Sequence, residues 1–257
     1  MTTVAEFTAS VAARTHQEDA ASWDPVGLQL GNPASPVGKI AICHEITEEV
    51  IQAISQHRCD LVVTYHPLLF AKTNRLLVGR SAEARAFSLI HLGVSLFVTH
   101  TDFDAMDGGT ADALASVFKL RATKPFGGDP VNGQPHIGRY GEFEGTLAVV
   151  DAMAADAFGS SGLRISGDPS QNIESLAVVP GSGSDFIDQA AEVADAIVTG
   201  DVGHHRAVRA LDLSLAIVDP GHIATERPGM RALVDLVTEV ASVDVVDLTE
   251  LDPKTWD

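Results

Sequence analysis

The chain has 257 residues, 45% of them hydrophobic, and its 35 acidic and 17 basic side chains give a formal net charge of −18. This hydrophobic content argues against a disordered chain, and the length suffices for one large or two modest domains. A surface with this much negative charge repels the phosphate backbone of nucleic acids. We therefore expect no nucleic-acid partner.

The cysteines and the apolar segments narrow the class of protein further. Cys43 and Cys59 lie in apolar, strand-like segments and form no CxxC pair, which argues against a cysteine zinc ribbon and a disulfide framework. No run reaches about 18 consecutive apolar residues, so no membrane span is predicted. Residues 1–16 lack the basic start and apolar core of a signal peptide and predict an amphipathic helix. We therefore expect a cytoplasmic protein without a membrane partner.

Strands and helices alternate in the first half of the chain. The hydrophobic periodicity predicts strands at 38–46, 59–66 and 94–100, and helices at 47–57, 81–93 and 108–120. Thr47 is the expected N-cap of the second helix, and Gly93 is expected to end the third.

A connection rich in Gly, Pro and Asn, residues 124–138, is the best candidate for a boundary between lobes. The alternation restarts beyond it. Strands are predicted at 139–145, 173–181, 195–200, 213–221 and 243–248, and helices at 146–158, 184–194, 202–211 and 227–240. The pattern predicts an α/β fold with mixed, largely parallel sheets flanked by helices.

Four predicted strands end in imidazole, phenol or carboxylate side chains. In chain order these are Tyr65 and His66; His100, Asp102 and Asp104; Asp201, His204 and His205; and Asp219, His222 and Glu226. Ligands gather beyond the carboxyl ends of strands in open α/β sheets. His222 and Glu226 stand four residues apart, so they share a face if a helix begins near Gly221. Imidazole with carboxylate indicates a site for zinc, iron, manganese or cobalt.

Simpler interpretations stay open for each of these residues. A histidine after a strand is commonly a hydrogen-bonded turn residue, and at least one of the adjacent His204 and His205 must point away from any single site. The segment 180–186, PGSGSDF, is either an anion cradle or a tight turn between a strand and a helix. Trp23 is either a core anchor or part of a cleft wall.

Seven segments together resemble the Nif-three-like dinuclear-metal family, whose members are often named GTP cyclohydrolase I type 2 homologs. WDPVGLQLG is similar to WDNVGLQVG, YHPLLF to HHPL(I/L)F, HTDFDAMDGG to HTNLDAAPGG, VTGDVGHH to ITGDxxHH and DPGHIATE to DAGHYATE, while IGRYGEF and AVVPGSG resemble second-lobe signatures. The segments occur in family order across nearly the whole chain. The chain resembles the short form of the family, which lacks a large insertion.

The resemblance implies a toroidal hexamer of two-lobed chains with a dinuclear metal centre, one or two divalent ions being bound per chain. The implied lobes are 1–123 plus 218–257, which carries the metal ligands, and 124–217. By position, His66, Asp104 and Glu226 would hold one metal. His222, a bridging Glu226 and the first histidine of the HHP motif would hold the second, but this chain has Tyr65 at that last position. A neutral phenol is a poor ligand unless a cation depresses its pKa.

Two functions therefore stay open. The first is a metal-dependent hydrolase of a nucleotide or another phosphorylated small molecule, in which a metal-bound water is the nucleophile and His100 or Asp102 is the base or orients it. The second is a non-catalytic hexameric metal-binding or scaffold protein. Tyr65 favours the second, because two-metal chemistry needs both ions.

Overall fold

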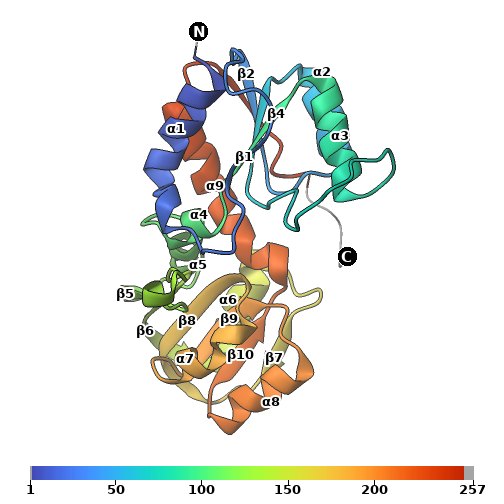
Figure 1. Ribbon diagram of the computed structural model, residues 1–257. Coiled ribbons are helices and arrows are strands. Elements are labelled where there is room, and N and C mark those ends of the chain that lie inside the picture. The colour runs from blue at the N-terminus through green and yellow to red at the C-terminus, as the bar shows by residue number, and fades with distance from the viewer. Residues whose placement is uncertain (1, 252–257) are drawn as a thin grey trace. The chain divides into compact units, whose positions relative to one another are not determined.

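The structure is a computed structural model that describes residues 2–251, and it divides into two compact units (Figure 1). The first unit comprises residues 2–103 and 233–251, and the second comprises 104–232. Residues 104–123 and 218–232, which the family resemblance assigned to the first lobe, lie in the second unit. The two boundaries fall inside α4 (Thr101–Ala105) and α9 (His222–Val240).

The first unit is built on a five-stranded sheet of order β1-β4-β3-β2-β11. Its strands are β1 (Gly27–Leu30), β2 (Lys39–Cys43), β3 (Leu61–Thr64), β4 (Ser95–Val98) and β11 (Asp244–Asp247). All run parallel except the edge strand β1, which is antiparallel to β4. Strands β3 and β4 are buried along their whole length, as expected for central strands of a parallel sheet covered on both faces.

Helices α1 (Val4–Thr15), α2 (Glu48–His57) and α3 (Ala82–Leu92) belong to this unit. The Thr47 hydroxyl accepts a hydrogen bond from the backbone of Val50, and Gly93 ends α3 with φ of +73°, so both predicted caps are confirmed. A core cluster joins Val50 and Ile54 of α2 and Leu89 of α3 to the strands. This packing fixes the strand ends that carry the histidines described below.

The second unit contains a six-stranded sheet of order β5-β6-β8-β9-β10-β7. Its strands are β5 (Arg121–Phe126), β6 (Gly138–Thr146), β7 (Arg164–Ser166), β8 (Asn172–Ser182), β9 (Ala196–Gly200) and β10 (Ala216–Asp219). Strands β8, β9 and β10 are parallel, and the remaining pairs are antiparallel. The predicted α/β class with mixed sheets is therefore confirmed.

Helices flank both faces of this sheet, as the two-residue period of β8 requires. Val178 belongs to a cluster with α5 (Thr110–Val117) and α6 (Leu147–Phe158), whereas Val179 belongs to a cluster with α7 (Ile187–Ala191) and α8 (His204–Asp212). No helix among residues 2–251 is long and apolar enough to cross a membrane.

Four elements were not predicted from the sequence: β1, β5, β7 and α4. Helix α9 begins at His222, five residues before its predicted start, and it contains Pro228. Proline is common in the first turn of a helix, which is why the sequence pattern indicated a start there. The earlier start places His222 and Glu226 on one helix, as the site prediction required.

Candidate metal centre

Three neighbouring strand ends of the first unit bring aromatic side chains together. Strands β2, β3 and β4 are parallel and in register, so His44, the pair Tyr65–His66, and His100 emerge at the same edge of the sheet. The ring centroids of His44 and His66 lie 4.7 Å apart, and those of His66 and His100 lie 5.6 Å apart. The parallel register thus gathers three imidazoles and one phenol at one place.

His44 is a member of this cluster that the site prediction missed. The sequence pattern predicts one strand over 38–46 with His44 in its interior, whereas β2 ends at Cys43. The backbone N–H of His66 donates to the His44 carbonyl at 2.9 Å, and the Thr64 hydroxyl donates to the same oxygen at 3.1 Å. The signal available in the sequence was the same as at the other strands: an imidazole directly after an apolar run.

Tyr65, which occupies the place of a histidine in the family motif, is fully buried. Its ring centroid lies 5.4 Å from that of His44, 5.2 Å from that of His66 and 5.2 Å from that of His100. The phenol therefore lies among the imidazoles, whereas the Trp23 ring lies beside Phe70 and His100.

His100 is held by a buried aspartate. Its Nδ1 atom lies 3.0 Å from Oδ2 of Asp24, which also accepts from the backbone N–H and the hydroxyl of Thr101. Burial raises the pKa of Asp24, but the hydrogen bonds from His100 and Thr101 outweigh burial and hold that pKa below its usual value. An ionised carboxylate only accepts hydrogen bonds, so Nδ1 carries the proton and the neutral ring has its lone pair on Nε2.

Asp102, the other candidate base, is hydrogen-bonded to its own segment and to Thr15 of α1. Its carboxylate accepts from the backbone N–H of His100 at 2.7 Å and from the Thr99 hydroxyl at 3.1 Å. Burial raises the pKa of this carboxyl group, and the hydrogen bonds from Thr15, His100 and Thr99 offset only part of the effect. The side chain stabilises the turn that delivers His100.

In the second unit, the start of α9 brings two predicted ligands together. Nε2 of His222 lies 3.1 Å from Oε1 of Glu226, and Nδ1 of His222 lies 2.7 Å from Oδ2 of Asp201. Burial lowers the pKa of His222, but the hydrogen bonds and negative charges of Glu226 and Asp201 outweigh it and raise that pKa to about 9. Nε2 contacts Glu226, so a metal bound at Nε2 would replace the proton on that atom, while Asp201 orients the ring through Nδ1, as is usual for a histidine ligand.

The turn at Gly181 leaves space beside this pair. A Cβ atom at Gly181 would lie 2.5 Å from Oε1 of Glu226 and 3.3 Å from Nε2 of His222, and φ of +63° also favours glycine. The N–H of Gly181 donates to the Thr225 hydroxyl and that of Gly183 to the Thr199 hydroxyl. Because these two donors are already engaged, the segment is better described as a tight turn than as an anion cradle.

Three further predicted residues lie on α4 and α8. Asp104 is buried on α4, while His204 and His205 are exposed at the start of α8 with ring centroids 5.3 Å apart. His44 and His66 of the first unit and Glu226 of the second are side chains of the kinds that hold metal ions.

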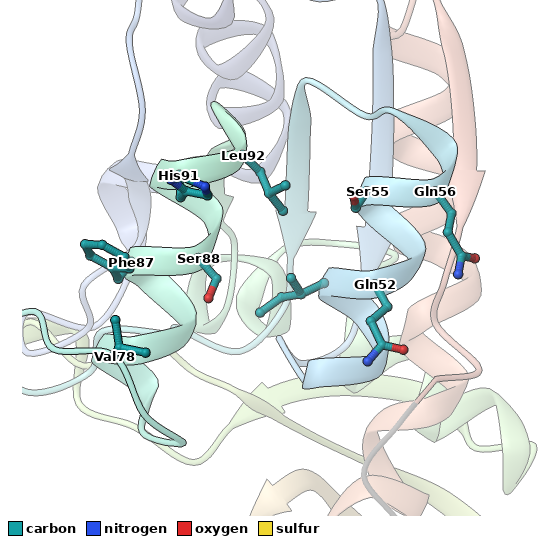
Figure 2. A pocket seen from close by; sticks show the side chains of 9 residues that line it. Gln52, Ser55, Gln56, Val78, Phe87, Ser88, His91 and Leu92 are labelled. Carbon is teal, nitrogen blue, oxygen red and sulfur yellow. The ribbon is translucent and has the colours of Figure 1, made fainter.

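A groove of about 540 Å³ lies elsewhere in the first unit, between α2 and α3 (Figure 2). Figure 2 shows Gln52, Ser55 and Gln56 of α2 on one side and Phe87 and Ser88 of α3 on the other. None of the lining residues belongs to the imidazole cluster or the His222–Glu226 pair. The groove is therefore not part of the candidate metal centre.

Comparison with known proteins places these features in a family context. The family model described as Duf34/NIF3 (NGG1p interacting factor 3) matches residues 2–253. A GTP cyclohydrolase 1 type 2 homolog of Clostridium perfringens is 31% identical over 226 residues, which cover 87% of this chain and 86% of the relative. A protein with the same description from Streptomyces coelicolor is 33% identical over 219 residues, covering 82% and 77%.

A solved structure shows the same fold. The Bacillus cereus protein related to NIF3 superposes with a TM-score of 0.89 at 18% sequence identity, covering 100% of this chain and 99% of that one.

Proposed function

The chain belongs to the Duf34/NIF3 (NGG1p interacting factor 3) family, and from this premise we propose that it binds divalent metal ions and uses them to hydrolyse a small molecule. The substrate class is a nucleotide or another phosphorylated compound. The observation that carries the proposal is that each unit presents metal-binding side chains, the imidazoles of His44 and His66 in the first unit and the pair His222 and Glu226 in the second.

The donor set fits a metal ion chemically. Imidazole nitrogens with a carboxylate oxygen suit zinc, iron, manganese and cobalt. At His222 the Asp201 carboxylate on Nδ1 directs Nε2 toward Glu226, and the lack of a side chain at Gly181 avoids a clash with both donor atoms. The residues present therefore match the group that the family implies.

We assign the ligands as follows: His44, His66, Asp104 and Glu226 hold one ion, and His222, Glu226 and Tyr65 hold a second. The full burial of Tyr65 among three imidazoles supports a role for its oxygen near the donors. A phenol binds less strongly than the imidazole it replaces, so the second position is the weaker one.

A bound divalent cation supplies Lewis-acid chemistry, which polarises a substrate oxygen and lowers the pKa of water. We propose that Nε2 of His100 accepts a proton from the attacking water. Asp24 holds the ring's own proton on Nδ1 and fixes the orientation of the ring. Asp102 stabilises the backbone that carries His100. We further propose a cytoplasmic toroidal hexamer, whose mass in light scattering would be six times the chain mass of 27.0 kDa.

The deciding measurement is metal content per chain by elemental analysis, on the wild type and on Tyr65→His, both purified without added metal. About two ions per chain in the wild type would support both metal positions and the hydrolase, whereas about one, rising to about two in the variant, would favour the binding or scaffold function. Absence of metal from both proteins would rule out the proposed site.

Turnover separates the catalytic function from the second candidate, a non-catalytic hexameric metal-binding or scaffold protein, which Tyr65 favours. A nucleotide panel is assayed with and without EDTA. Metal-dependent hydrolysis supports the enzyme, whereas bound metal without turnover on any member supports the scaffold.

A further inference from the structure

Two large aromatic side chains are exposed beside the imidazole cluster. The Trp23 side chain lies against Phe70 with ring centroids 5.9 Å apart, and the two residues are 52% and 59% exposed. Trp23 also meets the ring of His100 edge-on, at a centroid distance of 6.5 Å. We propose that Trp23 and Phe70 form a binding surface for the flat heteroaromatic ring of a nucleotide. The inference rests on the proposed function and names the part of the substrate that the site recognises.

The aromatic pair is held in place by polar contacts behind it. The Gln29 side chain donates to the carbonyl of Pro25 at 3.0 Å and to that of Leu69 at 3.1 Å, and it accepts from the N–H of Leu69 at 3.0 Å. One amide thus joins the segment that follows Trp23 to the segment that precedes Phe70. A ligand would meet a surface that is already ordered, so less conformational entropy is lost on binding.

The backbone of Trp23 is fixed from both sides as well. Ala21 donates its N–H to the Thr101 hydroxyl, and Asp24, with a fully buried side chain, accepts bonds from Thr101 and His100. With its backbone held in this way, Trp23 could have packed its side chain in the core, where burial of its apolar surface would stabilise the fold. Its exposure next to a candidate proton acceptor is instead the arrangement expected of a ring-stacking residue.

The residues that follow Phe70 in the sequence carry positive charge, which suits a ligand whose ring is attached to a phosphate group. Residues 61–82 contain no acidic side chain in a chain that has 35 of them, and the segment after Phe70 carries Lys72, Arg75 and Arg80, all exposed. This positive segment would attract an anionic group that the rest of the surface repels. A nucleoside monophosphate combines the two features, a flat ring and an attached phosphate.

The test is calorimetric titration of adenosine monophosphate into protein stripped of metal with EDTA. Trp23→Ala and Phe70→Ala are expected to raise the dissociation constant by about 5- to 150-fold, the range known for loss of base–aromatic stacking. Trp23→Phe keeps an aromatic ring and is expected to retain most of the affinity. Phe87→Ala removes an aromatic residue of α3 that is also exposed, and should leave the affinity unchanged.

Ribose 5-phosphate has the phosphate but no aromatic base. Its dissociation constant with the wild type should be at least as high as that of adenosine monophosphate with Trp23→Ala. Equal dissociation constants for adenosine monophosphate in the wild type, Trp23→Ala and Phe70→Ala would overturn the inference. Equal affinity of the wild type for adenosine monophosphate and ribose 5-phosphate would also overturn it, as would no binding of the nucleotide by the wild type. A change in oligomer mass in Trp23→Ala with unchanged nucleotide affinity would also overturn it.

The metal content of the purified protein, measured before EDTA treatment, separates this inference from the proposed function. Metal without nucleotide binding refutes the aromatic surface alone. Nucleotide binding that depends on Trp23, in a protein that takes up no metal, supports the surface and refutes the metal site.

Discussion

Oδ2 of Asp24 lies 3.0 Å from Nδ1 of His100, and the aspartate side chain is fully buried while the histidine faces the imidazole cluster. The contact joins the loop before β1 to the end of β4. It sets the tautomer of His100 and therefore which nitrogen faces the cluster. Asp201 and His222 repeat the arrangement in the second unit at 2.7 Å.

Asp24→Asn should lower the free energy of unfolding at neutral pH by about 1–3 kcal/mol, because the buried charge-assisted hydrogen bonds to His100 and Thr101 are lost. The pKa of Asp24 is lower in the folded than in the unfolded chain. Its ionised form therefore stabilises the fold above the unfolded pKa of about 3.9, and this stabilisation is lost as pH falls through the folded pKa. Urea unfolding from pH 7 to about pH 3 should show the two proteins converging at the acid end.

Asp156→Asn, at an exposed position on α6, is the matched control for Asp24→Asn and should follow the wild type throughout. A gap between Asp24→Asn and the wild type that stays constant with pH would contradict the assignment.

Asp201→Asn should weaken metal binding by about 10- to 100-fold, as loss of the group that orients a histidine ligand does. Asparagine tolerates the left-handed backbone at this position, where φ is +58°, so the change acts on the side chain. Competition titration with a chromogenic chelator measures the affinity. Asp188→Asn, which removes the partner of Arg209, serves as control, and equal affinities in both variants would refute the role of Asp201.

Gly181→Ala should weaken metal binding, because the added methyl group would crowd the donor atoms of Glu226 and His222. It should also destabilise the fold by about 1–2 kcal/mol through the left-handed φ. Gly93→Ala is the matched control, because Gly93 is left-handed with φ of +73° and has no atom within 4 Å of an added Cβ. The two variants are compared by thermal unfolding and metal titration. Equal metal affinities would show that the contact at Gly181 does not reach the site.

His44→Asn should lower metal affinity by about tenfold or more if His44 is a ligand, since few protein donors remain. Elemental analysis and chelator competition report the loss directly. His57→Asn, at the exposed end of α2, removes an imidazole outside the cluster and should bind metal like the wild type. Wild-type affinity in His44→Asn would leave His44 as a packing residue.

Local sequence determined much of the fold. Apolar runs defined the central strands, and the caps at Thr47 and Gly93 defined helix ends, because hydrogen bonds within a few residues settle such features. The edge strand β1 was missed because its segment is polar, and a strand with one neighbour need not be apolar on both faces. Strand β7, three residues long, has too short a pattern to detect.

In the candidate site, too, some features follow from the local sequence and others depend on the tertiary structure. The order of residues is enough to show that imidazoles and carboxylates follow the strands, and that His222 and Glu226 share a helix face, because the helical repeat sets that spacing. The folded structure was needed to show that His44 contacts His66, that Asp24 holds His100 across 76 positions of sequence, and that a side chain at Gly181 would clash with Glu226. These contacts depend on strand register and loop packing, which bring together residues that no local pattern relates.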